Sequence, residues 1–389
     1  SKTGFTTPIA AWQQHEAVVK RWRHRAPVSP NHHPWARRWG QYVLANAAVR
    51  DIANQPVGVI GAEPSIVQGP PLRLALLAPE MAIWGGIQAY MWRLWELALV
   101  LGGDGHSHAR GWTLNDGQDA LARWPHSSSP RPRGHGGRPL ALVGNLLLDR
   151  TQGETMIVGH VHLAPVAWIR RLLGHDLRYV VVLHGIEAWG RLGWLRRRAL
   201  ARADAVVVTT AFSRDACVAA NQLSPENFHV IPLCLPEPAT AARNCDALGG
   251  GWPILYVGRL ARTEQRKGLE TVMAATRELR QRGMPVTLHI VGDGDDRARL
   301  QAIATADGLG DDAVRFHGTV DSITLDRYYR SARLFVMPSA KEGFGLVFLE
   351  AMKHGVPCIG GRHGGTPEVF RDGVEGMLVD YGDIAQLVD

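Results

Sequence analysis

Cysteine is scarce in this sequence, and the few cysteines stand far apart. The four are Cys217, Cys234, Cys245 and Cys358, with no C-x-x-C pair and no clustered histidine partners. This spacing argues against a disulfide framework and against a zinc site, because both need several ligands at short intervals. We therefore expect reduced thiols in a folded core.

Long apolar runs are also missing. No run of 18 apolar residues occurs, so no membrane-spanning helix is expected. The chain starts at Ser1 without a basic, apolar, cleavable leader, which predicts a cytoplasmic rather than a secreted protein. The net charge of +7 comes without a nucleic-acid-binding motif, so nucleic acid is not an expected partner.

What is present is the composition of an ordinary folded protein, with 389 residues, 46% hydrophobic and 20% charged. This length accommodates two or three domains. Residues 1–70, rich in Trp, His, Pro and Arg, form an appended basic segment that we expect to be partly ordered. Alternating strand and helix patterns at 71–235 and 254–389 predict two Rossmann-like, doubly wound α/β domains. A linker rich in Pro, Gly and Ala joins them at 236–253.

The most informative stretch runs from Arg333 to Gly355, RLFVMPSAKEGFGLVFLEAMKHG. An apolar strand leads into a glycine-containing turn and then into a helix. Such a turn aims free backbone N–H groups and the positive end of a helix dipole at one point, which suits a diphosphate. Glu342 and Glu350 would repel that anion unless they face hydroxyl groups of a sugar or a ribose. The pattern therefore favours a nucleotide-sugar ligand.

Two glutamates separated by seven residues, in E-G-F-G-L-V-F-L-E, resemble the signature of family 4 retaining glycosyltransferases, which have two Rossmann-like domains in the GT-B fold. The resemblance implies that Glu342 contacts the donor sugar as a catalytic residue and that Glu350 binds the nucleotide ribose. On the spacing alone, an amphipathic helix with a solvated acid is the better explanation. The E-G-F-G turn, the strand before it and the motifs below favour the glycosyltransferase.

Two cations precede this stretch in the second predicted domain. Arg259 lies near the end of ILYVGRL, residues Ile254–Leu260, where the strand ends, and Lys267 stands where a helix begins. A guanidinium and an ammonium converging on a helix N-terminus can clamp a diphosphate, although read alone they are surface charges. The spacing of G-R-L before K-G-L resembles the family's donor diphosphate site, which the resemblance completes with Gly343, Phe344 and Gly345. It also implies that three residues border the nucleotide: Gly292, Gly318 and Val320.

In the first predicted domain the candidate residues follow strands. His184 and Glu187 come after the buried strand in YVVVLHGIEAW, and open α/β sheets bind ligands at that edge. A histidine there is often structural, but H-G-I-E resembles the family's H-G-x-[DE] element, whose histidine approaches the transferred sugar. We expect Glu187 to orient a neighbour. Gly85 and Gly86 follow the first strand, and the resemblance places their loop near the cleft and the acceptor, although a plain tight turn would look the same.

Three further stretches of the first domain carry expectations. LALVGNLLL, residues 140–148, is expected to be an apolar strand. Residues 102–139 are poor in apolar residues and are expected to form a long loop, interpreted as an acceptor lid. In residues 190–204, Trp194, Leu195 and Ala199 are expected to form one apolar stripe among arginines. With residues 168–178, this segment fits either an anionic membrane surface or a solvated helix face.

Both ends of the sequence also carry expectations. Residues 1–50 resemble the C-terminal end of asparagine synthetase-like proteins, with Lys2 where that family has a lysine near its ATP site. Since the glutaminase domain and the pyrophosphatase signature are absent, this segment is a natural fusion, a joined upstream frame or simply a basic extension. The chain stops at Asp389 as a helix begins, whereas family members continue, so the second domain is expected to be truncated.

Together these features predict a metal-independent enzyme without a cofactor. It would move a sugar from a nucleotide-diphosphate sugar to a glycan or lipid-linked acceptor with retention of configuration, in cell-surface polysaccharide synthesis. One alternative is a nucleotide-sugar 2-epimerase-like enzyme on the same fold, because fold does not fix chemistry. The other is a non-catalytic nucleotide-binding module fused to a synthetase-like protein.

Overall fold

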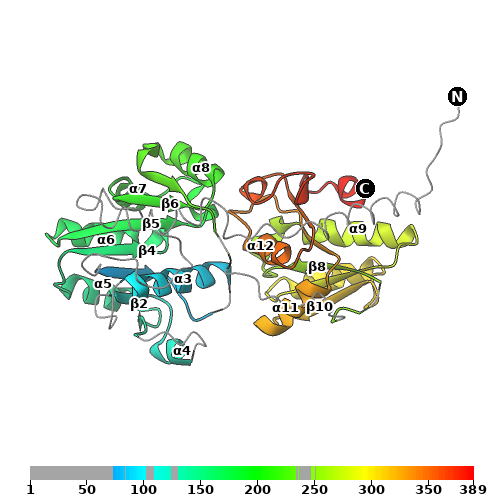
Figure 1. The fold of residues 1–389 in the computed structure, drawn as a ribbon, viewed down its shortest axis with the longest axis horizontal. Coiled ribbons are helices and arrows are strands. Elements are labelled where there is room, and N and C mark those ends of the chain that lie inside the picture. Colours follow the sequence, from blue (N-terminus) through cyan, green and yellow to red (C-terminus); the bar gives the residue numbers. More distant parts are fainter. Residues whose placement is uncertain are drawn as a thin grey trace. The chain divides into compact units, whose positions relative to one another are not determined.

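The computed structural model describes residues 73–83, 85–101, 109–123, 130–233, 235, 247–249 and 251–389. The described chain divides after Leu233 into two units, each built on its own sheet (Figure 1). The appended segment predicted at 1–70 lies outside the described residues, as does most of the predicted linker. The first strand of the second unit begins at Trp252, inside the span predicted as linker.

The first unit contains a seven-stranded sheet in the order β3-β2-β1-β4-β5-β6-β7. All its neighbouring strands are parallel. The strands are β1 (Leu74–Ala78), β2 (Ala109–Thr113), β3 (Arg133–Gly134), β4 (Glu154–Val158), β5 (Leu177–Leu183), β6 (Ala205–Val208) and β7 (Phe228–Val230). The helices are α3 (Gly86–Leu101), α4 (Gln118–Arg123), α5 (Pro139–Leu148), η2 (Val161–Leu163), α6 (Ala164–Leu172), η3 (Ile186–Ala188), α7 (Trp194–Ala201), α8 (Ala211–Asn221) and η4 (Pro225–Asn227).

Both faces of this sheet are buried. Along β1, Ala75 and Leu77 belong to one hydrophobic cluster, while Leu74, Leu76 and Ala78 belong to a second. Successive side chains of a strand point to opposite faces, so an uninterrupted apolar strand needs cover on both sides. This explains why β1 is buried along its whole length.

The second unit contains a six-stranded sheet in the order β10-β9-β8-β11-β12-β13, again parallel. The strands are β8 (Trp252–Val257), β9 (Val286–Val291), β10 (Val314–Gly318), β11 (Leu334–Met337), β12 (Cys358–Gly361) and β13 (Gly376–Val379). The helices are η5 (Arg262–Lys267), α9 (Leu269–Gln281), α10 (Arg297–Ala306), α11 (Ser322–Ser331), α12 (Leu346–Lys353), η6 (Thr366–Glu368) and α13 (Ile384–Val388).

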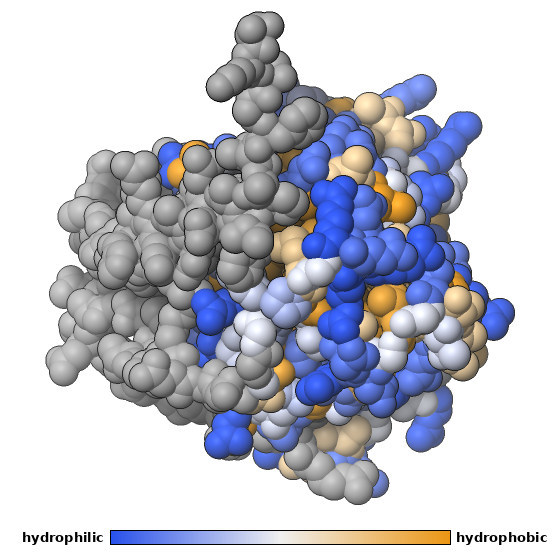
Figure 2. All heavy atoms as spheres, turned by 90° about the vertical axis from the view of Figure 1, so that its right-hand side faces the viewer, coloured by the Kyte–Doolittle hydropathy of each residue, from blue (hydrophilic) through white to orange (hydrophobic). Residues whose placement is uncertain are grey.

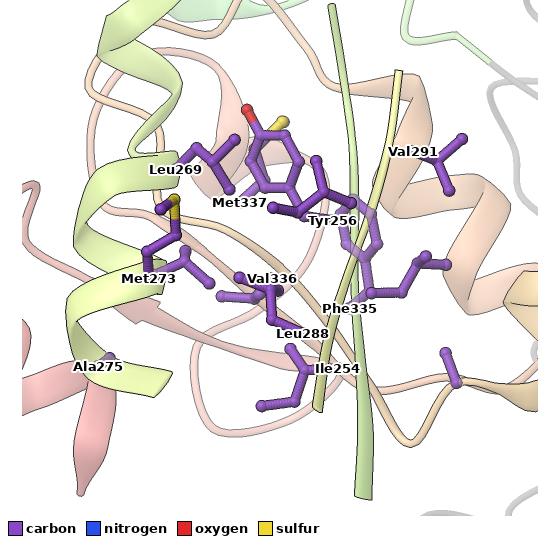
Figure 3. Packing of buried hydrophobic residues seen from close by; sticks show 14 of the residues in the cluster. Ile254, Tyr256, Leu269, Met273, Ala275, Leu288, Val291, Phe335, Val336 and Met337 are labelled. Carbon is purple, nitrogen blue, oxygen red and sulfur yellow. The ribbon is translucent and has the colours of Figure 1, made fainter. Parts of the chain in front are cut away.

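A hydrophobic core fixes α9 on the second sheet. Figure 3 shows Leu269 and Met273 of α9 pointing toward Tyr256 and Val336 of the central strands. Each fully buried side chain of this kind contributes about 1.5–3 kcal/mol to the free energy of folding. In the part of Figure 2 that is drawn in colour, hydrophilic residues predominate and the apolar areas are small and separate.

In each sheet the strand order reverses at one point, and ligands of such sheets bind at the carboxyl ends of the strands there. The reversal lies between β1 and β4 in the first unit and between β8 and β11 in the second. The predicted residues Gly85 and Gly86 follow β1. Arg259 follows β8, and Glu342 follows β11.

The strand predicted at residues 140–148 is wrong, because these residues form helix α5. Pro139 stands in the first turn, where its missing N–H is not needed. Leu142 and Leu146, four residues apart, are buried, whereas Leu140 and Leu148 are 86% and 80% exposed. A short apolar run does not distinguish a strand from a helix, and here only one helical face is covered.

The long loop predicted at residues 102–139 also needs correction. Its described part contains β2, α4 and β3, and β2 pairs along its whole length with β1. Arg110 of β2 forms ion pairs with Asp149 and Glu154. The sequence ARGWT carries too few apolar residues to be recognised as a strand. Its position in the sheet comes from pairing with β1 and from these ion pairs.

The apolar stripe predicted on α7 is only partly correct. Ala199 is buried, but the buried residue beside it is Leu200, while Trp194 is 65% exposed and Leu195 is exposed. The rings of Trp194 and Trp168, on α6, instead form a T-shaped pair with 6.2 Å between their centroids. Among the described residues, no helix is both long enough and apolar enough to cross a membrane.

Two of the four cysteines lie within the described residues. Cys217 and Cys358 are buried, and neither is in a disulfide. Burial raises the pKa of the Cys217 thiol to about 12 and also raises the pKa of Cys358. Both are therefore protonated and unreactive at neutral pH, as the sequence predicts for core thiols.

Candidate functional site

The turn between β11 and α12 holds Glu342 and its glycines. The amide N–H of Gly343 donates to the Glu342 carboxylate at 3.1 Å. Gly345 precedes α12 with φ of 93°, and a Cβ there would lie 2.6 Å from the Phe348 ring, so glycine is required on both counts. Burial raises the pKa of Glu342, an effect that Lys267 and the amides of Gly343 and Phe344 partly oppose. In this state the amides expected to face a diphosphate are engaged by Glu342.

Glu350 lies on the second turn of α12, and a buried tyrosine orients it. The hydroxyl of Tyr329, on α11, donates to Oε2 of Glu350 at 2.8 Å. Burial raises the pKa of Glu350, against the effects of Tyr329 and Lys353. Since a carboxylate has two acceptor oxygens, this bond leaves Oε1 to accept a hydroxyl proton from a ligand. Tyr329 is not part of any sequence motif, and only the fold reveals its role.

Arg259 and Lys267 converge, as the sequence predicts, but they converge on a carboxylate. Glu264 binds Arg259 Nη2 at 2.7 Å and Lys267 Nζ at 2.7 Å. The side chain of Arg259 is 72% exposed and that of Lys267 24%. Although burial raises the pKa of Glu264, the two cations hold it below its usual range. No sequence motif identifies Glu264. The feature that could have indicated its ion pair with Lys267 is its position one helical turn before that lysine.

Backbone hydrogen bonds join the segment of Lys267 to the segment of Glu342. The carbonyl of Arg266 accepts from the amide of Ala340 at 2.8 Å and from the Ser339 hydroxyl at 3.3 Å. Gly268 adopts φ of 80°, and a Cβ on it would lie 2.6 Å from the Pro338 carbonyl oxygen. The two predicted halves of the diphosphate site are therefore one continuous structure at the reversal point of the second sheet.

The predicted nucleotide-binding glycines lie next to each other. The amide of Gly292 donates to the Gly318 carbonyl at 2.9 Å, and their φ values are 133° and 70°. A Cβ on Gly292 would overlap the carbonyl of Gly258, beside Arg259. Val320 is half-buried and packs on the same core. This arrangement brings three strand-end loops together through their backbones, and contact with a base stays a prediction.

In the first unit the candidate residues surround the end of β5. The ring Nε2 of His184 donates to the Gly159 carbonyl at 2.8 Å, and Glu187 accepts from the His184 amide at 2.6 Å. Glu187 thus holds the His184 backbone in place, and its role toward a ligand stays a prediction. The ring of Tyr90, on α3, meets the His184 ring edge-on at 6.0 Å.

The loop of Gly85 and Gly86 is less informative. Gly86 begins α3, and both glycines are exposed. A Cβ on Gly85 would collide with the side-chain oxygen of Gln88, whose amide nitrogen donates to Glu80 at 2.8 Å. Since the end of a flexible side chain can move aside, these contacts do not by themselves require glycine at position 85, and the acceptor role of the loop stays a prediction.

The charged groups of the site are cations and single carboxylates. Within the described ranges, no group of three or more His, Cys, Asp or Glu side chains is arranged to hold a metal ion. The site offers a ligand two cations with Glu264 between them, two further half-buried carboxylates and the N-terminus of α12. Such a set suits an anion attached to a polyhydroxylated group.

Family models match almost the whole described chain. Residues 84–235 match the model described as Glycosyltransferase Family 4, and residues 253–389 match the model described as Glycosyl transferases group 1. Neither match extends into residues 1–50, so the synthetase-like resemblance of that segment stays a prediction.

Two curated relatives illustrate the sequence similarity. A "GDP-mannose-dependent alpha-(1-6)-phosphatidylinositol monomannoside mannosyltransferase" of Mycolicibacterium smegmatis is 32% identical over 259 residues, covering 63% of this chain and 62% of the relative. A "D-inositol 3-phosphate glycosyltransferase" of Acidothermus cellulolyticus is 32% identical over 212 residues, covering 49% of this chain and 46% of the relative. The chain thus spans less than two thirds of the length of these relatives.

Solved structures confirm the predicted fold. Anabaena Alr3699/HepE in complex with UDP and glucose matches with a TM-score of 0.66 at 19% identity, covering 82% of this chain and 88% of that one. The sucrose-phosphate synthase of Thermosynechococcus elongatus matches with a TM-score of 0.64 at 24% identity over the same shares. At these identities the likeness shows the fold alone, which is GT-B with two parallel α/β domains.

Proposed function

We propose that this chain, which carries a family 4 glycosyltransferase domain followed by a group 1 glycosyltransferase domain, transfers a sugar from a nucleoside diphosphate sugar to a glycan or lipid-linked acceptor. The observation that carries the proposal is the continuous structure formed by the Lys267 and Glu342 segments in the second unit. It combines cations for the diphosphate with carboxylates for hydroxyl groups. The curated relatives act, by their names, on GDP-mannose and on inositol-based acceptors.

In this proposal the second unit stabilises the leaving group. As the bond from the sugar to the diphosphate breaks, negative charge grows on the diphosphate oxygens. Arg259 and Lys267 are already in position before the reaction and neutralise that charge as it forms. Electrostatic stabilisation of this type often dominates catalysis. Glu264 holds the two cations on one side of the site and offsets part of their charge when no donor is bound.

The carboxylates hold the donor by its hydroxyl groups. Glu350, oriented by Tyr329, accepts from the nucleotide ribose, and Glu342 accepts from the donor sugar. Once Glu342 does so, the amides of Gly343 and Phe344 are released to the diphosphate. With His184 beside the transferred sugar, the acceptor hydroxyl attacks from the face that the diphosphate leaves, which retains configuration, and the hydroxyl proton passes to an oxygen of the leaving diphosphate. The two cations supply the positive charge, so the scheme requires no metal.

Peripheral binding to an anionic membrane completes the proposal, in line with a cytoplasmic protein acting on lipid-linked acceptors. The exposed residues of α7 and the adjoining loop include Trp194 and Leu195 and several arginines, Arg191, Arg196 and Arg198, without an acid among them. Each basic residue at an anionic leaflet contributes about 1 kcal/mol. Co-sedimentation with vesicles that contain anionic lipid tests this, and equal binding to neutral vesicles would contradict it.

The transfer itself is tested by donor turnover. The protein is incubated with UDP-glucose, GDP-mannose or ADP-glucose, with water as the acceptor. Release of the nucleoside diphosphate is measured, and the anomeric form of the sugar that is released first is determined. We expect one donor to be consumed with its anomeric configuration retained, and Lys267→Ala to lower kcat/KM by roughly 100-fold. Release of the inverted anomer would refute retention.

The same experiment separates the alternatives. A 2-epimerase-like enzyme would yield a sugar with altered configuration at C2. A non-catalytic module would bind nucleotide without consuming any donor, and would be indifferent to His184→Ala.

A further inference from the structure

Helix η5 leads from Arg259 to Lys267, and apolar packing does little to fix its position. Each of its six residues is at least partly exposed, and its backbone leaves helical geometry at Glu264. A cavity lined by Glu264 and Gln265 also borders on the core side chain of Tyr256. Polar contacts, rather than a packed apolar face, therefore decide where η5 lies.

The turn after β9 supplies several of these contacts. The amide of Leu260 donates to the Asp293 carbonyl at 3.0 Å, and the Leu260 carbonyl accepts from the Asp296 amide at 2.9 Å. Gly294, with φ of 158°, lets the two chain segments approach, because a Cβ there would lie 2.2 Å from the Leu260 carbonyl oxygen. The residues that lead into η5 are thus fixed to this turn.

Asp295, in the same turn, caps η5 from outside the helix. Ala261 precedes η5 and has no side-chain oxygen to cap it. Instead, Oδ1 of Asp295 accepts from the amide of Arg262, the first residue of η5, at 3.0 Å. The carboxylate satisfies one of the free N–H groups at the start of the helix. Because Asp295 is exposed, its removal should leave the core of the second unit intact.

Asp296 is buried and holds η5 by a second route. It stands at the N-terminal cap of α10, yet its carboxylate binds two side chains instead of capping that helix. Arg299 donates to both of its oxygens at 2.6 Å, and Nε2 of Gln265 lies 3.5 Å from Oδ2. Arg299 also donates to Glu270, in the first turn of α9, at 2.7 Å. The pair of Asp296 and Arg299 therefore connects α10 to η5 and to the start of α9.

We propose that Asp295 and Asp296 are positioning residues of the donor site, which set η5 so that Arg259 and Lys267 converge. The proposal rests on the proposed function, because only there do these cations hold a diphosphate. By charge alone, a nearby carboxylate weakens the binding of an anion. A loss of affinity when one of these aspartates is removed therefore reports on the position of the cations and not on charge.

The first test follows the amine of Lys267 without any ligand. Lysines are acetylated briefly with acetic anhydride, and the rate at each site is read by mass spectrometry. The Lys267 side chain is 24% exposed and its Nζ lies 2.7 Å from Glu264, so that the ion pair partly shields it from the reagent. Lys353, on α12, is the internal reference. Asp307→Ala is the matched control, because Asp307 also pairs with an arginine of α9, Arg277, at 2.5 Å.

We expect Asp295→Ala and Asp296→Ala to raise the acetylation rate of Lys267 about threefold or more relative to Lys353. Asp295→Asn keeps an oxygen that can accept from the Arg262 amide, so it should change the rate less than about twofold, as should Asp307→Ala. An unchanged rate at Lys267 in both alanine variants, or an equal rise at Lys353, would overturn the proposal.

The second test measures the Kd for inorganic pyrophosphate by titration calorimetry, because pyrophosphate offers the diphosphate without base or sugar. Asp295→Ala should raise the Kd about fivefold, whereas Asp295→Asn keeps the cap, loses a negative charge and should bind at least as tightly as the wild type. When Lys267→Ala is already present, Asp295→Ala should raise the Kd less than about twofold, since a positioning residue acts through the cation that it places. Equal losses in both backgrounds, or tighter binding by Asp295→Ala, would contradict this role.

The two tests also separate this inference from the proposed function. A wild type that binds no pyrophosphate would count against the proposed diphosphate site, while acetylation of Lys267 would still show whether the aspartates place that cation. Pyrophosphate binding that neither aspartate affects would leave the donor site standing and overturn the inference alone.

Discussion

Glu342 is held where its charge is unfavourable. Burial raises its pKa, so the folded state disfavours the carboxylate that the unfolded state carries freely at neutral pH. Two backbone amides and Lys267 offset part of this cost without removing it. A group with a raised folded pKa lowers stability above its unfolded pKa, and this effect disappears in acid, where both states hold the neutral acid. Such costs are common where a residue is kept for binding a ligand.

Glu342→Gln should therefore stabilise the protein and inactivate it. At pH 7 we expect the thermal midpoint to rise by a few degrees, because the amide keeps one acceptor oxygen and carries no charge. At pH 4 the gain should vanish. Donor turnover should fall roughly 100-fold or more. A variant that is no more stable at pH 7, or that keeps full turnover, would contradict the role given to Glu342.

The residues of the candidate site are only partly predictable from the sequence. Arg259, Lys267 and Glu342 follow strands at one sheet edge, and position along the chain is enough to bring such residues together. Glu264 and Tyr329 act through ion pairs and a hydrogen bond to those residues. Partners of this kind depend on side-chain geometry, which no motif spacing records.

At the level of elements, β9 and β10 are joined by a pair of histidines. Nδ1 of His289 lies 3.0 Å from Nε2 of His317, and the two rings are stacked. The Tyr328 hydroxyl contacts the other ring nitrogen of His317 at 3.2 Å. Burial lowers the pKa of His289 to about 4 and also lowers the pKa of His317. One proton shared between the two nitrogens suits this geometry, whereas a proton on both would set two N–H donors against each other.

The second unit should consequently lose stability in acid. Below about pH 6.5 His289 binds a proton in the unfolded chain but stays neutral in the folded protein. The free energy of unfolding therefore falls as the pH drops toward 4. Between pH 7.5 and 5, His289→Phe should reduce the fall in thermal midpoint by a few degrees. His363→Gln, at an exposed histidine, should behave like the wild type. An identical pH dependence in His289→Phe would show that the pair does not titrate as described.

Element prediction succeeds where burial is two-sided. The apolar strand expected at Leu334–Met337 is β11, because a central parallel strand needs apolar residues at every position. Residues 140–148 carry an equally apolar run but form α5, since periodicity over so short a stretch does not separate the two structures. The edge strand β3 has two residues, so pairing rather than composition defines it.

At the level of the whole molecule, the two units divide the proposed reaction. The second unit holds the groups suited to a nucleoside diphosphate, where its sheet reverses strand order, and the first holds His184 at the end of β5. The account therefore depends first on the donor site, since without a bound nucleotide no sugar is positioned for transfer.

The most direct measurement is thermal unfolding with UDP, GDP or ADP, each in excess, on the wild type and on Lys267→Ala. A nucleotide at 100 times its Kd adds about 2.7 kcal/mol to the free energy of unfolding, which raises the midpoint by several degrees. Arg282→Ala, at the opposite end of α9 from Lys267, is the matched control. We predict a rise with one nucleotide that Arg282→Ala keeps and Lys267→Ala loses. A midpoint that no nucleotide raises, or a rise that survives in Lys267→Ala, would contradict the donor site described here.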